Sequence, residues 1–144
     1  MTHVDFYILP DTTREARLDF ACRLAETIYR KGYRLHVHTQ DEDEAQAFDE
    51  RLWTFREDSY VPHALSDSGH DVPVTIGWQA LPEPALDAPG SEAMLNLSLT
   101  IPEWFSRFER VAEIINQHQA ILTAKRDCWQ TYKQRGYPVK AHKL

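Results

Sequence analysis

Two hydrophobic periods alternate along the first 54 residues of the chain. Residues 3–9 form a short, mostly apolar run, which is typical of a strand. Residues 12–31 then place apolar side chains at helical spacing and end on cationic residues before Gly32. Residues 34–38 alternate polar and apolar again, and residues 39–53 return to helical spacing. Strand, helix, strand and helix in this order predict the beginning of a parallel α/β sheet.

A capping-box spacing marks the start of both predicted helices. Thr12 stands three residues before Glu15, and Thr39 stands three residues before Glu42. In such a box the threonine hydroxyl and the glutamate carboxylate each accept a hydrogen bond from the backbone amide of the other residue. We therefore expect the helices to begin at Thr12 and Thr39.

The rest of the chain is less regular. In order, its pattern predicts a loop over 54–71 with a turn at 66–69, a strand over 72–78, a proline-rich surface excursion over 81–90, a strand over 94–99 and a short helical turn near Trp104. Residues 110–115 fit a strand and are also compatible with a helix. Residues 116–135 predict a long helix that Gly136 and Pro138 end.

These elements predict a single α/β domain over residues 1–144, a Rossmann-like, mostly parallel sheet flanked by helices, without a glycine-rich nucleotide loop. We expect a compact core over residues 1–136 and a C-terminal tail over residues 137–144. A chain of 144 residues with 42% hydrophobic positions can bury such a core. Only Cys22 and Cys128 are present, which favours reduced thiols in the cytoplasm. The chain shows neither a signal-peptide pattern nor an 18-residue apolar run, so we expect no membrane segment.

The net charge of −6 is unevenly distributed. Residues 117–144 hold six Lys or Arg against Asp127 alone, whereas the preceding residues are strongly acidic. An acidic protein is a poor ligand for duplex DNA, and a basic end suggests a partner for that end. A solvated basic helix end that complements its own dipole is an equally good interpretation.

Catalytic and cofactor chemistry finds little support in the residues. The turn over 10–13 contains no glycine and carries an acid, so it does not fit a phosphate. His36 and His38 lie two apart on one strand without further metal ligands nearby, and they fit a polar sheet-face pair better than a metal site. His63 follows in a loop without an identifiable nucleophile. We expect no catalytic residues, cofactor or metal, and keep as the alternative a small α/β nucleotide-binding enzyme that uses the C-terminal edge of the sheet.

Aromatic residues near cations are the remaining signal. On the last helix, Leu122, Arg126, Trp129 and Lys133 form a stripe beside the predicted core face. A tryptophan flanked by guanidinium and ammonium groups suits an anionic ligand with an apolar end, although Trp129 could also simply complete the core. A second aromatic group, formed by Trp53, Phe55 and Tyr60, follows the second helix and could be a small core or a docking patch.

Three segments carry a resemblance to a known family: residues 3–55, beginning HVDFYILPDTTREARL; DSYVPHAL; and AKRDCWQTYKQRGY. Their order and spacing over essentially the whole chain resemble the chi subunit of bacterial DNA polymerase III. The resemblance implies a Rossmann-like fold, no catalysis, and two protein partners. One is the psi subunit of the clamp loader, and the other is the acidic C-terminal tail of single-stranded DNA-binding protein, which ends in phenylalanine. DNA would be reached only indirectly.

The resemblance also assigns residues to these partners. Arg126 matches the arginine of the tail-binding helix, and Trp129 stands where the family often has tyrosine. Gln130 and Leu122 stand where the family pattern has lysines, so either Lys125 and Lys133 compensate or the affinity is lower. Trp53 and Tyr60 match aromatic positions of the psi-facing surface, and we group Phe55 with them.

Overall fold

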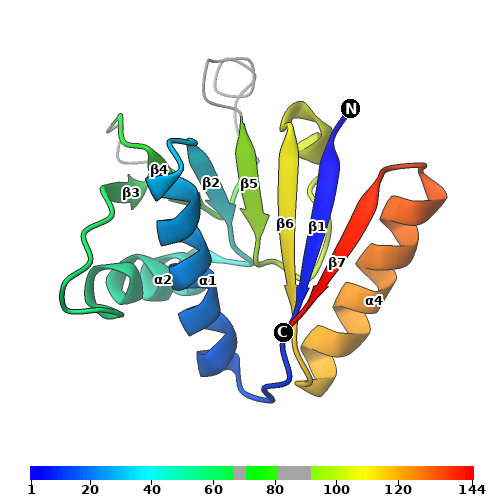
Figure 1. The fold of residues 1–144 in the computed structure, drawn as a ribbon, viewed down its shortest axis with the longest axis horizontal. Helices are drawn as coiled ribbons and strands as arrows, with labels where there is room; N and C mark the ends of the chain where they lie inside the picture. Colours follow the sequence, from blue (N-terminus) through cyan, green and yellow to red (C-terminus); the bar gives the residue numbers. More distant parts are fainter. Residues whose placement is uncertain (67–70, 81–91) are drawn as a thin grey trace.

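The computed structural model describes residues 1–66, 71–80 and 92–144, and its centre is a parallel sheet of seven strands (Figure 1). The strand order across the sheet is β3-β4-β2-β5-β6-β1-β7. The strands are β1 (His3–Ile8), β2 (Leu35–His38), β3 (His63–Leu65), β4 (Val74–Gly77), β5 (Ala93–Asn96), β6 (Arg110–Ile115) and β7 (Val139–Lys143). The prediction of one Rossmann-like α/β fold with a parallel sheet is confirmed, and residues 110–115 are a strand.

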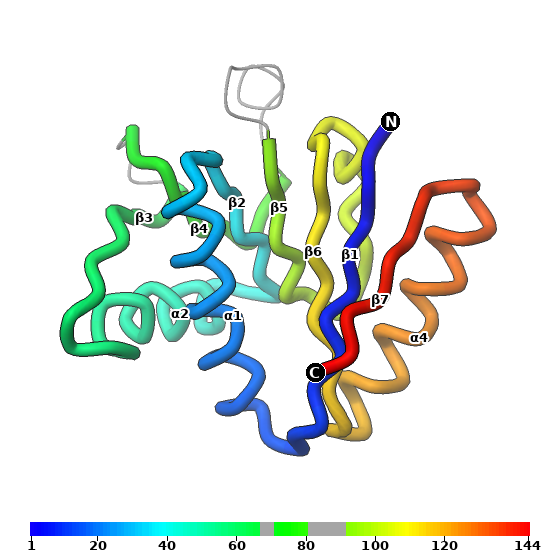
Figure 2. The backbone as a smooth tube through the Cα atoms, viewed as in Figure 1, coloured from blue at the N-terminus to red at the C-terminus, as the bar shows by residue number. Residues whose placement is uncertain are grey.

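Helices cover both faces of this sheet. They are α1 (Arg14–Arg30), α2 (Glu42–Thr54), α4 (Gln119–Gln134) and the 3-10 helix η2 (Glu103–Arg107). Figure 2 shows α1 and α2 toward the β3 end, and α4 beside β7 at the opposite end. The connection from β1 to β2 and the connection from β6 to β7 cross the sheet in opposite directions. Because such crossovers are right-handed, their helices α1 and α4 lie on opposite faces.

Two hydrophobic cores result, one on each face of the sheet. Alternate residues of β1, namely Val4, Phe6 and Ile8, pack with α4 and η2. Ala112 and Ile114 of β6 instead pack with α1 and α2. This division follows from the two-residue period of a strand, which turns successive side chains to opposite faces.

Both helices begin later than the capping-box spacing predicts. The N-cap of α1 is Thr13, whose hydroxyl accepts a hydrogen bond from the Ala16 amide. The N-cap of α2 is Asp41, whose carboxylate accepts a hydrogen bond of 2.9 Å from the Glu44 amide. Thr39 is fully buried at the end of β2, and its hydroxyl lies 3.1 Å from the Gly77 carbonyl oxygen. Thr39 therefore belongs to the buried end of β2, and Asp41 caps α2 in its place.

The C-terminal tail expected over residues 137–144 contains a strand that the sequence pattern did not predict, since residues 139–143 form β7. This strand pairs in parallel with β1 from Val4↔Val139 to Ile8↔Lys143. Gly136 makes the turn after α4 with φ of +83°, a conformation that favours glycine. Residues 63–65, expected within a loop, form the short edge strand β3. Both strands lie at the edges of the sheet, where each pairs with one neighbour only, β3 with β4 and β7 with β1.

Three further expectations concern the proline-rich segment, the two cysteines and membrane-spanning helices. The proline-rich excursion over 81–90 lies outside the described residues, as does most of the turn at 66–69. Cys22 and Cys128 are free and buried, and burial raises the pKa of Cys22 to about 12. None of the helices within 1–66, 71–80 and 92–144 combines the length and apolar character needed to cross a membrane.

Candidate functional site

A pocket of about 400 Å³ opens between α4 and the C-terminal ends of β1 and β6. It contains five of the six residues that the sequence singled out on the last helix. Its lining residues are Phe6, Ile8, Ile115, Gln117, Leu122, Lys125, Arg126, Trp129 and Gln130. The sequence did not point to Gln117 or to the residues from β1 and β6, because only the parallel pairing of these strands brings Ile8 beside Ile115.

The inner part of this pocket is apolar. Phe6 is buried on β1, and its ring meets the Trp129 ring edge to face at a centroid distance of 5.0 Å. Ile8 and Leu122 are half-buried at the pocket wall. The indole of Trp129 is itself half-buried, so it both closes the core and presents a surface to the pocket. Such an apolar wall can hold one large hydrophobic side chain.

Cations lie at the rim of the pocket. Arg126 is exposed, and its guanidinium takes part in no ion pair with any residue that the structure describes. The Lys133 ammonium lies over the Trp129 ring, 5.5 Å from its centroid, although Lys133 does not line the pocket. Gln130 adds a neutral polar group. This combination of an apolar interior with a cationic rim can bind a ligand that has an apolar end and a negative charge.

Lys125 does not belong to this cationic rim, which corrects the expectation that it could compensate for missing lysines. Its side chain is fully buried, and its ammonium donates hydrogen bonds of 2.5 Å to the Ser98 carbonyl and to the Glu113 carboxylate. The charge is therefore neutralised below the pocket, and only the stem of Lys125 contributes to the lining. The helical period cannot reveal this, because the partners come from β6 and from the segment that follows β5.

Glu113 is the centre of that buried polar network. Its second carboxylate oxygen accepts hydrogen bonds from the Tyr132 hydroxyl at 2.6 Å and from the Asn96 amide at 2.9 Å. Burial, with the neighbouring Glu113 carboxylate, strongly raises the pKa of Tyr132, so the phenol stays protonated as a donor. With Lys125, these contacts join α4 to the sheet beneath the pocket.

The second aromatic group is divided by the structure. Trp53 and Tyr60 are 45% and 67% exposed, and their rings lie 5.7 Å apart. Trp53 also covers the buried His63 ring, with centroids 4.0 Å apart. Trp53 and Tyr60 therefore form an exposed aromatic patch over the loop that leads into β3.

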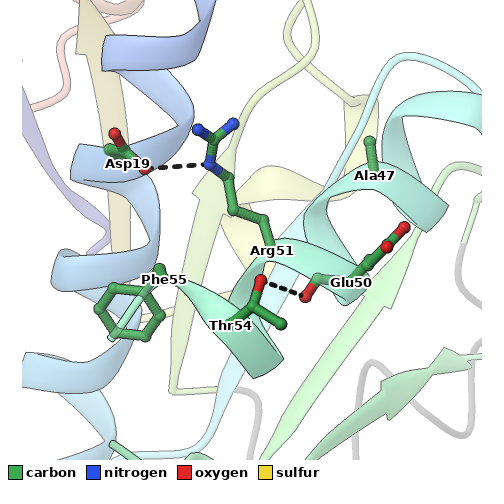
Figure 3. A pocket seen from close by; sticks show the side chains of 6 residues that line it. All are labelled: Asp19, Ala47, Glu50, Arg51, Thr54 and Phe55. Atoms are coloured by element: carbon green, nitrogen blue, oxygen red, sulfur yellow. Dashed lines mark hydrogen bonds and ion pairs between the residues drawn. The ribbon is translucent and has the colours of Figure 1, made fainter. Parts of the chain in front are cut away.

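Phe55 lies elsewhere, half-buried against the core on the α1 side. Figure 3 shows it at the edge of a second pocket between α1 and α2, where Arg51 donates a hydrogen bond of 2.9 Å to Asp19. Grouping Phe55 with Trp53 and Tyr60 is thus wrong in geometry. Residues 53 and 55 are about 200° apart around a helix end, which turns them to different surfaces.

The residues considered for catalysis are engaged in structural contacts. Both His63 ring nitrogens face backbone carbonyl oxygens, those of Val61 at 2.6 Å and Asp49 at 2.9 Å, so the buried ring is engaged in structural contacts. His36 is buried, its Nδ1 lies 2.8 Å from the Thr75 hydroxyl, and burial lowers its pKa to about 3. Across the described part of the chain, no group of three or more His, Cys, Asp or Glu residues could hold a metal.

The chain is similar to known proteins over almost its whole length. The family model described as DNA polymerase III chi subunit, HolC, matches residues 1–140. A protein of Pseudomonas aeruginosa named DNA polymerase III subunit chi is 40% identical, covering 100% of this chain and 98% of the relative. Proteins of the same name from Haemophilus influenzae and Escherichia coli are 26% and 24% identical, each over at least 95% of both chains. The chain therefore belongs to the DNA polymerase III chi subunit family.

Proposed function

We propose that this chain is a non-catalytic, cytoplasmic accessory subunit of the DNA polymerase III holoenzyme. In this role it binds the acidic C-terminal tail of single-stranded DNA-binding protein in the pocket beside α4, and the psi subunit through Trp53 and Tyr60. It would thereby link the clamp loader to protein-coated single strands and reach DNA only indirectly. The observation that carries the proposal is that Arg126 lines the same pocket as the apolar wall formed by Phe6 and Trp129.

The chemistry of the tail matches this combination of a cation and an apolar wall. A terminal phenylalanine offers an aromatic ring and a free carboxylate on the same residue. The ring fits against the apolar wall that Trp129, Phe6 and Ile8 form, and burial of an aromatic side chain is worth about 1.5 to 3 kcal/mol. The carboxylate suits the guanidinium of Arg126, whose planar fork can donate two parallel hydrogen bonds.

The patch of Trp53 and Tyr60 supports the second contact. Large exposed aromatic side chains are enriched among the residues that contribute most to protein interfaces. The two rings lie side by side, and a partner that covered both would remove from water an apolar area that the free chain leaves exposed.

The test of the proposal is a calorimetric titration with an acidic peptide that ends in Pro-Phe with a free carboxylate. We expect micromolar binding to the wild-type chain and a loss of about tenfold or more in Arg126→Ala, because a charge-assisted bidentate contact is worth about 1.5 to 3 kcal/mol. Amidation of the peptide terminus should cause a similar loss.

The matched control is Arg23→Ala, which removes an exposed arginine from α1 and leaves the same net charge as Arg126→Ala. Its affinity should equal that of the wild type within about twofold. If Arg126→Ala and Arg23→Ala bind the peptide equally well, or if the amidated peptide binds as well as the free acid, the assignment of the pocket is wrong.

A further inference from the structure

The last strand brings a cation to the pocket that helical spacing alone does not reveal. Lys143 is the final residue of β7 and pairs in register with Ile8 of β1, which lines the pocket. Partners in register on neighbouring parallel strands point to the same face of the sheet, and the strands are about 4.8 Å apart. The side chain of Lys143 therefore lies on the α4 face, one strand beyond Ile8.

The orientation of α4 opens the pocket toward β7. Lys125 reaches the carbonyl oxygens of Asn96 and Ser98 at the end of β5. One turn further along the same face of the helix, Trp129 lies against Phe6 of β1. Since the strand order is β5-β6-β1-β7, Trp129 is the residue of the two that lies nearer β7.

The same end of the sheet carries all of these groups. Ile8 pairs with Ile115, the last residue of β6, and Lys143 pairs with Ile8. In Figures 1 and 2 the end of β7 lies beside β1, which separates it from β6. Arg126 lines the pocket from the helix, and Lys143 stands on the edge strand next to the lining residue Ile8, although Lys143 does not itself line the pocket.

The charge of Lys143 is available for a ligand. Its side chain is exposed, and it forms no hydrogen bond or ion pair with the residues in 1–66, 71–80 and 92–144. The pocket lining contains no carboxylate group, and Glu113 beneath it is already neutralised by Lys125. A negatively charged ligand in the pocket would therefore meet Lys143 without competition from a nearby acid of the lining.

The geometry points to Lys143 as a specificity-determining cation of the peptide site, which pairs with acidic residues upstream of the apolar terminus of the ligand. This inference rests on the proposed function of the pocket. In this arrangement Arg126 binds the terminal carboxylate of the peptide, and Lys143 on β7 binds the upstream acids. Lys143, and not Lys125 with its buried charge, then supplies the positive charge that the neutral side chains of Leu122 and Gln130 lack.

The chain supplies a closely matched control for this inference. Lys140 lies on the same strand, is exposed and carries the same charge. It pairs in register with Asp5, whereas Lys143 pairs with Ile8, so the two lysines point to opposite faces of the sheet. The variants Lys143→Ala and Lys140→Ala have the same net charge, so a difference between them reflects position and not the overall field of the protein.

The experiment titrates wild type, Lys143→Ala and Lys140→Ala with two peptides that both end in Pro-Phe with a free carboxylate. One peptide keeps its upstream aspartates, and in the other they are replaced by asparagine. For the acidic peptide we expect Lys143→Ala to bind about two- to fivefold more weakly at low salt, with a smaller difference at high salt. Lys140→Ala should bind like the wild type, and the asparagine peptide should not distinguish the three proteins. Thermal melting of each variant confirms that it is folded.

The outcomes separate this inference from the proposed function. If the wild-type chain does not bind the acidic peptide, the proposed function fails. If the wild type binds but Lys143→Ala and Lys140→Ala lose affinity equally, or neither loses any, the proposed function stands and the role of Lys143 is wrong. A loss in Lys143→Ala that persists with the asparagine peptide would overturn the assignment to upstream acids.

Discussion

The ammonium of Lys125 lies 2.5 Å from the carboxylate of Glu113, and neither side chain is exposed to solvent. This ion pair joins the middle of α4 to β6 directly under the pocket. A buried charge pair adds little net stability over a hydrophobic pair, but the loss of one partner leaves the other charge buried and unpaired.

We therefore predict that Lys125→Ala lowers the free energy of unfolding by about 3 to 5 kcal/mol, because Glu113 then has no counter-ion. Urea denaturation measures the difference. The control is Lys133→Ala on the same helix, where the lysine is exposed and the loss should be below about 1 kcal/mol. Equal effects of the two substitutions would show that the Lys125 ammonium is hydrated in solution.

A second prediction concerns the double role of Trp129. Trp129→Ala removes both the edge-to-face contact with Phe6 and the pocket wall, so peptide affinity should fall about tenfold or more. Trp129→Tyr keeps an aromatic ring and should bind within about threefold of the wild type. Calorimetry with the Pro-Phe peptide measures both variants. If the tyrosine variant loses as much affinity as the alanine variant, the ring is not what the peptide contacts.

The two proposed contacts should be separable by substitution. Trp53→Ala removes an exposed ring from the patch and should weaken binding to the psi subunit by about tenfold or more, since central aromatic residues contribute about 2 kcal/mol or more to an interface. Its affinity for the acidic peptide should not change. Tyr33→Ala is the control, because Tyr33 is 44% exposed, close to the 45% of Trp53, and lies outside the patch. Immobilised psi subunit and surface plasmon resonance measure the difference.

A fourth prediction is a dependence of stability on pH that comes from His36. Burial lowers its pKa to about 3, against 6.5 for an ordinary histidine. Between these values the unfolded chain binds the proton that the folded chain does not bind. Stability is therefore fully present above pH 6.5 and is lost as the pH falls toward 3, by about 1.4 kcal/mol per pH unit in the steep part.

His36→Gln should remove this part of the slope, while His3→Gln, at an exposed position, should keep it. Urea denaturation at pH 7, 6, 5 and 4 measures the slopes. His38 shifts in the same direction, because burial also lowers its pKa, so some slope remains in His36→Gln. Parallel curves for wild type and His36→Gln would contradict the prediction.

The sequence by itself determined the features that repeat locally. Helical spacing located α1, α2 and α4, and placed Leu122, Arg126 and Trp129 on one stripe, because neighbours three or four residues apart share a helix face whatever the rest of the chain does. The family resemblance added the expectation that this stripe binds an acidic protein tail. The excess of Lys and Arg over Asp and Glu after residue 116 is likewise known from the sequence alone.

The tertiary structure decided which of those side chains are available to a ligand or a partner. It buried Lys125 against Glu113, turned Phe55 away from Trp53, and made the expected tail into β7. The burial of Lys125 and the pairing of β7 depend on partners in other elements, and local periodicity carries no information about such partners. The floor of the pocket and the position of Lys143 exist only because β6, β1 and β7 pair side by side in parallel.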